Sequence, residues 1–253
     1  MPRRSSESAS GHRRYRWQGR EYTSVTTILG NGVPKQQALV PWAAKAVAEW
    51  TAENFDQVKA LMETDPGDAI QVMKGAHYKA KKAAGLKGTE IHALAEAHAK
   101  GEPLPPVSPA AAEYVPALME FLEDWRPDPV LTEVTVFSLT HGYAGTLDSV
   151  ADFDDEKLGR RILDFKTSKG VYGETALQLA ALQWADGYDD PSNRDRVLVP
   201  MPKVDGGLVV HISPTGYALY LADIGREVFE AFLAAKTVAH FTTDLSKQVL
   251  TAI

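Results

Sequence analysis

The sequence predicts an α/β protein with a mixed sheet, because two kinds of periodicity follow each other along its 253 residues. Apolar residues recur at helical spacing through most of the first half, whereas strand-like alternation begins at Pro129. The second half then reads as strands, a helix, further strands and a final helix, an order typical of a sheet flanked by helices. We therefore expect one folded domain over residues 15–253, preceded by a disordered basic tail at residues 1–14.

The helical half extends from about residue 38 to residue 126. Its periodicity predicts helices over residues 38–52, 54–64, 68–84, 89–100 and 109–125. Thr89 has the side chain of an N-cap and is expected to begin the fourth of these helices. Ahead of the helices, Gln18-Gly19 suits the turn of a short hairpin over residues 15–23.

The sheet core is expected between residues 129 and 222. "PVLTEVTVFSL" and "YAGTLDSVADF" flank a turn at residues 140–142 and should pair as an antiparallel hairpin. A second turn, at residues 154–159, leads into the strand "RRILDFK". The remaining elements are a helix at 173–188, strands near 195–201, 207–213 and 217–222, and a final helix at 224–239.

The composition excludes several classes of site. The chain contains no cysteine, which rules out disulfides, zinc–thiolate sites and iron–sulfur clusters ligated by cysteine. No apolar run approaches the roughly 18 residues of a membrane span. The N-terminal segment also lacks the apolar core of a signal peptide. These features predict a soluble, cytoplasmic protein, in the host cytoplasm if a phage encodes it.

Positive charge is concentrated in two segments, although the net charge is −6. Residues 1–20 contain six arginines and one acid, and residues 74–87 contain five lysines and no acid. The lysines are Lys74, Lys79, Lys81, Lys82 and Lys87. Such segments suit a polyanionic partner, although a solvated helix face produces the same pattern.

An acid and an amine lie inside one predicted strand. Asp164 and Lys166 are two residues apart and so share a face of the strand. Asp148 lies among apolar residues of the preceding strand, where it can face Asp164 across the sheet. Two carboxylates at that distance repel each other unless a cation lies between them, and oxygen ligands suit Mg²⁺ or Mn²⁺. The pattern predicts a metal site with a lysine beside it.

Several segments of the chain together match the motifs of one protein family. "GTLDSVADFDDEKLGRRILDFKTSKG", followed by "ALQLAALQWA", resembles the catalytic core of the PD-(D/E)XK nuclease superfamily, and in particular of its RecB-like and phage exonuclease branch. "KGTEIHALAEAHAKG" resembles the helical histidine motif of the branch. "YTSVTTILG" and "PWAAKAVAEW" resemble the N-terminal segment of its phage members. The resemblance implies a restriction-endonuclease-like core with a mixed central sheet flanked by helices.

The resemblance also implies a set of metal ligands. Asp148 and Asp164 match the two motif acids, and the backbone carbonyl of Phe165 would complete their ligation. His92 matches the histidine that completes or neighbours the metal site. Glu133 matches the additional acid of the first strand. The metal expected is Mg²⁺ or Mn²⁺, without an iron–sulfur cluster.

Two further residues match catalytic positions that are not ligands. Lys166 would activate the attacking water and steady the phosphate, and Gln178 would help to place this lysine and the scissile phosphate. The glutamine motif often has a tyrosine four residues later, where this chain has Leu182. Trp184 and Tyr188 are candidates to replace that aromatic ring.

The resemblance implies a metal-dependent exonuclease that degrades linear DNA from its ends, in phage-type recombination, repair or DNA processing. The five lysines of residues 74–87 are candidates to hold the DNA backbone. A single-strand annealing protein or a recombinase is a candidate partner. Two alternatives remain: an inactive DNA-binding or adaptor protein of the same fold, and a metal-dependent hydrolase of small phosphate compounds.

Overall fold

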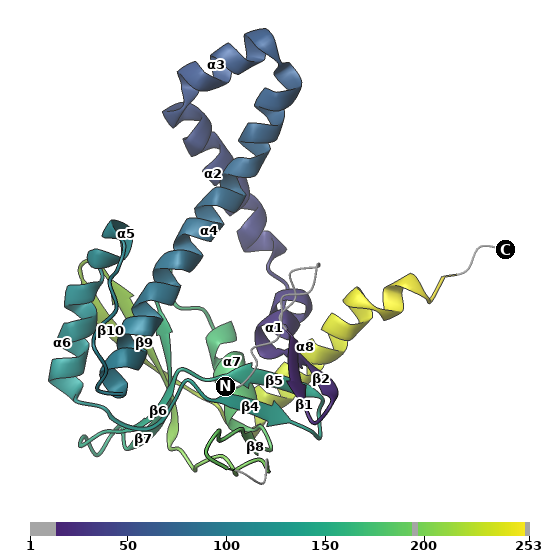
Figure 1. The fold of residues 1–253 in the computed structure, drawn as a ribbon. Helices are drawn as coiled ribbons and strands as arrows, with labels where there is room; N and C mark the ends of the chain where they lie inside the picture. Colours follow the sequence, from purple (N-terminus) through teal and green to yellow (C-terminus); the bar gives the residue numbers. More distant parts are fainter. Residues whose placement is uncertain (1–13, 194–196, 251–253) are drawn as a thin grey trace. The chain divides into compact units, whose positions relative to one another are not determined.

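A computed structural model describes residues 14–193 and 197–250 of the chain (Figure 1). The predicted disordered tail lies outside these ranges, except that Arg14 begins the first strand. The described chain forms two compact units, one made of residues 34–89 and the other of the segments before and after them. The predicted helical half is therefore divided between the two units. Within the described ranges, no helix has both the length and the apolarity needed to cross a bilayer.

Two mixed sheets form the framework of the larger unit, where the sequence predicted one. The first contains β1 (Arg14–Trp17), β2 (Arg20–Ser24), β5 (Tyr143–Thr146), β4 (Thr135–Ser138) and β8 (Gly187–Tyr188), in that order. The second contains β10 (Gly216–Ala222), β9 (Gly206–Ser213), β7 (Arg160–Lys166), β6 (Ser149–Asp152) and β3 (Asp128–Thr132). Neighbouring strands are antiparallel except β2 with β5 and β7 with β9. The predicted mixed α/β class is confirmed.

The predicted N-terminal hairpin is present as β1 and β2. Its turn residues Gln18 and Gly19 have φ angles of 44° and 80°. Two consecutive positive φ angles match the right-handed twist of a tight hairpin, and glycine adopts them without steric cost. Ser24 then ends β2, and its hydroxyl accepts a hydrogen bond from the amide of Thr27 at 3.0 Å. This cap begins α1 (Val25–Gly32), a helix that the sequence reading missed.

The predicted hairpin over residues 129–153 is confirmed in its pairing, but it bends from one sheet into the other. β4 pairs with β5 in the first sheet, and β3 pairs with β6 in the second. Glu133, with a φ of 52°, breaks the first arm, while Leu147 and Asp148 break the second. Across the break, the amide of Glu133 donates to the Asp148 carbonyl at 2.9 Å, which keeps the arms paired. Asp148 therefore precedes β6, and its predicted place in mid-strand was wrong.

The helices before the sheet differ from prediction at two points. α2 (Gln36–Glu53) and α3 (Phe55–Thr64) match, but the next two predicted helices form one helix, α4 (Pro66–Ala99). Thr89 is not a cap, since its hydroxyl donates to the Gly85 carbonyl inside α4. The last predicted helix is divided into α5 (Pro109–Ala112) and α6 (Val115–Trp125). Pro116 has no N–H to continue the helical hydrogen bonds at this point.

The later helices are shifted at their ends. α7 (Glu174–Gln183) is shorter than predicted, because Gly187 and Tyr188 leave the helix and pair with β4. α8 (Arg226–Thr243) begins two residues later than predicted and is followed by a short 3₁₀ helix, η1 (Leu245–Lys247). The strand predicted near residues 195–201 lies partly outside the described residues; in the described part, Val199 forms an isolated bridge with Tyr188.

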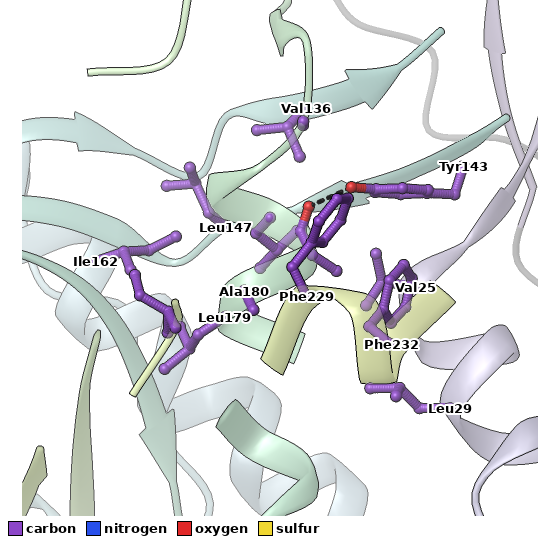
Figure 2. Close-up of a cluster of buried hydrophobic side chains, with 14 of the residues drawn as sticks. Val25, Leu29, Val136, Tyr143, Leu147, Ile162, Leu179, Ala180, Phe229 and Phe232 are labelled. Carbon is purple, nitrogen blue, oxygen red and sulfur yellow. Dashed lines mark hydrogen bonds between the residues drawn. The ribbon is translucent and has the colours of Figure 1, made fainter. Parts of the chain in front are cut away.

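Apolar clusters pack against both faces of β7. Ile162 belongs to the cluster in Figure 2, which gathers side chains from α1, α7 and α8. In that cluster the Tyr143 hydroxyl donates to the Ala181 carbonyl at 2.8 Å, which joins β5 to α7. Leu163 and Phe165 point the opposite way, into a cluster with α6 and the C-terminal part of α4. Because side chains alternate along a strand, Asp164 must lie on the Ile162 face, which packs against α7.

We expect Gly32→Ala to destabilise the larger unit. A Cβ at Gly32 would lie 1.9 Å from the Ala235 carbonyl oxygen of α8, so α1 and α8 would have to separate. Overpacking of this kind costs about 1–3 kcal/mol. Gly30→Ala is the matched control on the same helix, because no atom lies within 4 Å of a Cβ there. Thermal denaturation should show a lower melting temperature for Gly32→Ala alone, and equal melting temperatures would contradict the close packing of α1 on α8.

Candidate active site

The end of β7 brings an acid, a lysine and a glutamine together. Lys166 Nζ lies 2.9 Å from Asp164 Oδ1 and 2.6 Å from Asp164 Oδ2. Gln178, on α7, donates from Nε2 to Asp164 Oδ1 at 2.9 Å. Its Oε1 accepts from Lys166 Nζ at 3.5 Å. The glutamine thus contacts both charged groups of the strand and restricts where each can point.

A second group of contacts lies on the other side of the same strand end. His92 comes from α4 and lies between the Asp148 carboxylate and the backbone of Phe165. Its Nδ1 is 3.3 Å from Asp148 Oδ2, and its Nε2 is 2.8 Å from the Phe165 carbonyl oxygen. Asp148 Oδ2 also accepts a hydrogen bond from the Phe165 amide at 2.9 Å. The backbone of Phe165 therefore fixes both the acid and the histidine.

Glu133 joins this second group. One ligand atom each from His92, Glu133 and Asp148 lie within 4.8 Å of one another, a spacing that a single metal ion can bridge. Glu133 reaches this position from the bend between the two sheets, where it has a positive φ angle. The bend therefore brings Glu133 and Asp148 to the same place, although the sequence separates them by 15 residues.

The pKa values of Asp148 and Asp164 are shifted in opposite directions by their surroundings. Burial opposes ionisation of Asp148, but the neighbouring His92, the Phe165 amide and Lys166 together lower its pKa. For Asp164, burial and the negative charge of Asp148 outweigh the attraction of Lys166 and raise the pKa to about 6. Burial also opposes charge on His92, yet Asp148 raises the pKa of that imidazole to about 9. At neutral pH the His92 imidazole is therefore protonated on both nitrogens and positively charged. Its Nδ1 donates to Asp148, and its Nε2 donates to the Phe165 carbonyl.

Asp164 has the least compensated oxygen of the site. The residue is 2% exposed, and its Oδ2 has no hydrogen bond of acceptable geometry, although Lys166 Nζ is close to it. A buried carboxylate oxygen without a full set of partners is costly, and such atoms are expected where a ligand completes them.

A pocket adjoins His92 and contains side chains that the sequence reading left unassigned. His98 and Glu96 line it together with His92, Thr132 and Glu133. Glu96 follows His92 by four residues on α4, the spacing that puts two side chains on one helix face, and this periodicity could have indicated it.

The structure does not bring the two candidate aromatic residues to this site as free rings. Trp184 stacks on Phe229 of α8 with centroids 5.4 Å apart, and its Nε1 donates to the Ile224 carbonyl at 2.8 Å. Tyr188 belongs to β8 and packs against the cluster of Figure 2. Both residues therefore have packing roles. The five lysines of residues 74–87 all belong to the smaller unit.

Comparison with known proteins does not identify the chain. No family model matches it, and no curated protein matches it. A solved structure titled "Crystal structure of SSO0001" is similar at 17% sequence identity and a TM-score of 0.30. The match covers 53% of this chain and 57% of that chain, so it spans little more than half of either protein.

Proposed function

We propose that this protein is a divalent-metal-dependent DNA exonuclease with a restriction-endonuclease-like core. The observation that carries the proposal is the composition of the β7 end: a buried acid, a partly buried acid, a backbone carbonyl, a lysine and a glutamine converge there. This combination is what hydrolysis of a phosphodiester requires, because a water must be activated beside a charge that builds up on the phosphate. The resemblance in sequence supports the same chemistry.

The donor set fits Mg²⁺ or Mn²⁺. Glu133 and Asp148, which the structure groups with His92, would supply carboxylate oxygens, the hard ligands that these ions prefer. Asp164 and the Phe165 carbonyl lie outside that group of three, and they would join it by exchanging their present contacts with Lys166 and His92 for the ion. Asp164 Oδ2 faces the Lys166 ammonium at 2.6 Å without a hydrogen bond of good geometry, so this oxygen keeps capacity for a further ligand. His92 is the nitrogen ligand of this set, and its imidazolium must lose one proton before a ring nitrogen can bind the metal ion. A bound divalent ion would lower the pKa of its water and neutralise charge on the phosphate.

Lys166 provides a fixed positive charge beside the reacting phosphate. Its side chain is 27% exposed, so part of it remains accessible to a substrate. Asp164 and Gln178 hold the ammonium in place, which reduces the reorganisation needed as charge develops on the phosphate. Gln178 acts as a positioning residue for both partners.

His92 and the Phe165 amide position Asp148. The carboxylate is fixed from two directions, by the imidazole and by the backbone N–H. Fixing it in advance means that little conformational entropy is lost when a ligand binds. His92 is therefore expected to affect ligand affinity more than the rate at saturation.

We expect Lys166→Ala and Asp164→Ala to reduce DNA hydrolysis by at least about a hundredfold, the cost typical of removing one electrostatic contact to a transition state. Release of labelled nucleotides from linear DNA in Mn²⁺ measures this, and EDTA should abolish release. Lys157→Ala is the matched control, since Asp155-Glu156-Lys157 repeats the acid-x-lysine spacing in an exposed turn. Full activity in Lys166→Ala would reject the mechanism. DNA binding without hydrolysis in the wild type would indicate the inactive adaptor.

Cleavage is expected to begin at DNA ends, because the family branch that the sequence resembles consists mostly of exonucleases. Linear duplex and linear single-stranded DNA should be degraded in Mn²⁺, whereas covalently closed circles at equal nucleotide concentration should persist. Linearising the circle with a restriction enzyme is the internal control, because it adds ends without changing the sequence. Circles degraded as fast as linear DNA would make the protein an endonuclease.

A further inference from the structure

The smaller unit, residues 34–89, buries small apolar residues such as Val58, Ala69 and Ala76 and exposes several larger apolar and aromatic side chains. No buried side chain is found in α2, and the three apolar clusters of the described chain include no residue of this unit. Exposed side chains include Trp42, Phe55 and Tyr78, of which Tyr78 is the most accessible at 69%. Single exposed rings are common on protein surfaces, so such a ring indicates a binding surface where other groups that favour a ligand lie beside it.

One face of α4 combines the most exposed of these rings with three lysines. Lys74, Tyr78, Lys81 and Lys82 follow one another at intervals of four, three and one residues. At about 100° per residue, this spacing places all four side chains within one sector of the helix. All four residues are exposed. We call these four residues the lysine–tyrosine face.

The charges of this face are not neutralised. Among the interactions of the described residues, none pairs Lys74, Lys81 or Lys82 with an acid, and residues 74–87 contain no acid. Lys79 differs, because its Nζ lies 5.6 Å from the ring centroid of Trp50, in a cation–π contact with α2. Of the lysines predicted to bind nucleic acid, Lys74, Lys81 and Lys82 are therefore the best placed, and Lys79 contributes to packing.

The Tyr78 ring is largely accessible. His77 lies beside it, with ring centroids 4.0 Å apart and an angle of 38° between the planes, and Tyr78 remains 69% exposed. An accessible flat ring with lysines on the same sector of the helix is a surface on which an unpaired base can stack while the flanking phosphates meet the lysines.

We propose that the lysine–tyrosine face binds single-stranded DNA, with Tyr78 stacked on an unpaired base. In a duplex the faces of the bases are covered by neighbouring base pairs, so Tyr78 could not stack on them. Duplex DNA would therefore be bound by the lysines alone. The three lysines around the ring, with no acid within residues 74–87, favour a polyanion over an apolar protein surface. That the ligand is DNA rests on the proposed function. The new part of the inference is that the smaller unit binds this DNA in single-stranded form.

Binding can be measured without hydrolysis by fluorescence anisotropy in EDTA. The probes are a fluorescein-labelled oligothymidylate of about 20 nucleotides, longer than one typical binding site, and a blunt duplex with the same number of phosphates. Wild type should prefer the single strand. Tyr78→Ala should weaken binding about tenfold, as expected for loss of one stacked base, whereas Tyr78→Phe should bind like wild type. Lys74, Lys81 and Lys82 changed together to Gln should reduce the salt slope by about 2.

The matched controls lie elsewhere in the smaller unit. Phe55→Ala removes a ring that is 63% exposed on α3, and Lys59→Gln removes an exposed lysine of the same helix. Both should leave affinity unchanged. The proposal is overturned if wild type fails to bind at low salt, prefers the duplex, or is indifferent to Tyr78→Ala. Absence of hydrolysis in Mn²⁺ with this binding pattern intact would refute only the nuclease, and hydrolysis without the pattern would refute only this face.

Discussion

The structure depends most on the electrostatic repulsion between two carboxylates, those of Asp148 and Asp164, near the end of β7. Asp164 is almost fully buried, and the charge of Asp148 raises its pKa further above the ordinary range. A fold selected for stability alone would not keep such a pair, because apolar residues of similar size would cost less. The compensating groups are Lys166 and His92, each supplied by a different element and each in direct contact with one of the acids.

The rest of the larger unit positions this pair. The register of β7 against β6 and β9 keeps Leu163 and Phe165 in one apolar cluster and Ile162 in the other, which turns Asp164 toward α7. The bend of the 128–152 hairpin between the two sheets lets Asp148 face the Phe165 amide. A shift of one residue in either strand would exchange the two faces and move the acid into the wrong cluster.

The resemblance, and no local pattern, indicated that Gln178 lies beside Lys166. Local patterns were sufficient to predict the hairpins, the mixed α/β class, and the shared strand face of Asp164 and Lys166. Local patterns failed to predict features that depend on tertiary contacts or on an unusual backbone conformation. The division into two sheets depends on a positive φ at Glu133, a conformation that glutamate seldom adopts and that no pattern indicates. The continuity of α4 through Thr89 was missed because threonine is common both at caps and inside helices, where its hydroxyl can bond to the preceding turn. The place of His98 in the pocket depends on tertiary packing.

The most direct test of the central claim is the melting temperature of Asp164→Asn with and without Mn²⁺. The pKa of Asp164 is raised from 3.8 to about 6 in the folded protein, so the fold favours the protonated carboxyl. The stability that this residue contributes is therefore complete at low pH and is lost as the pH rises through 6. Without metal, the variant should melt above wild type at pH 8 and close to it at pH 4. Mn²⁺ should raise the melting temperature of wild type more than that of the variant. Asp154→Asn, in an exposed turn, is the control. A variant that melts below wild type at pH 8, with equal shifts in Mn²⁺, would contradict the account.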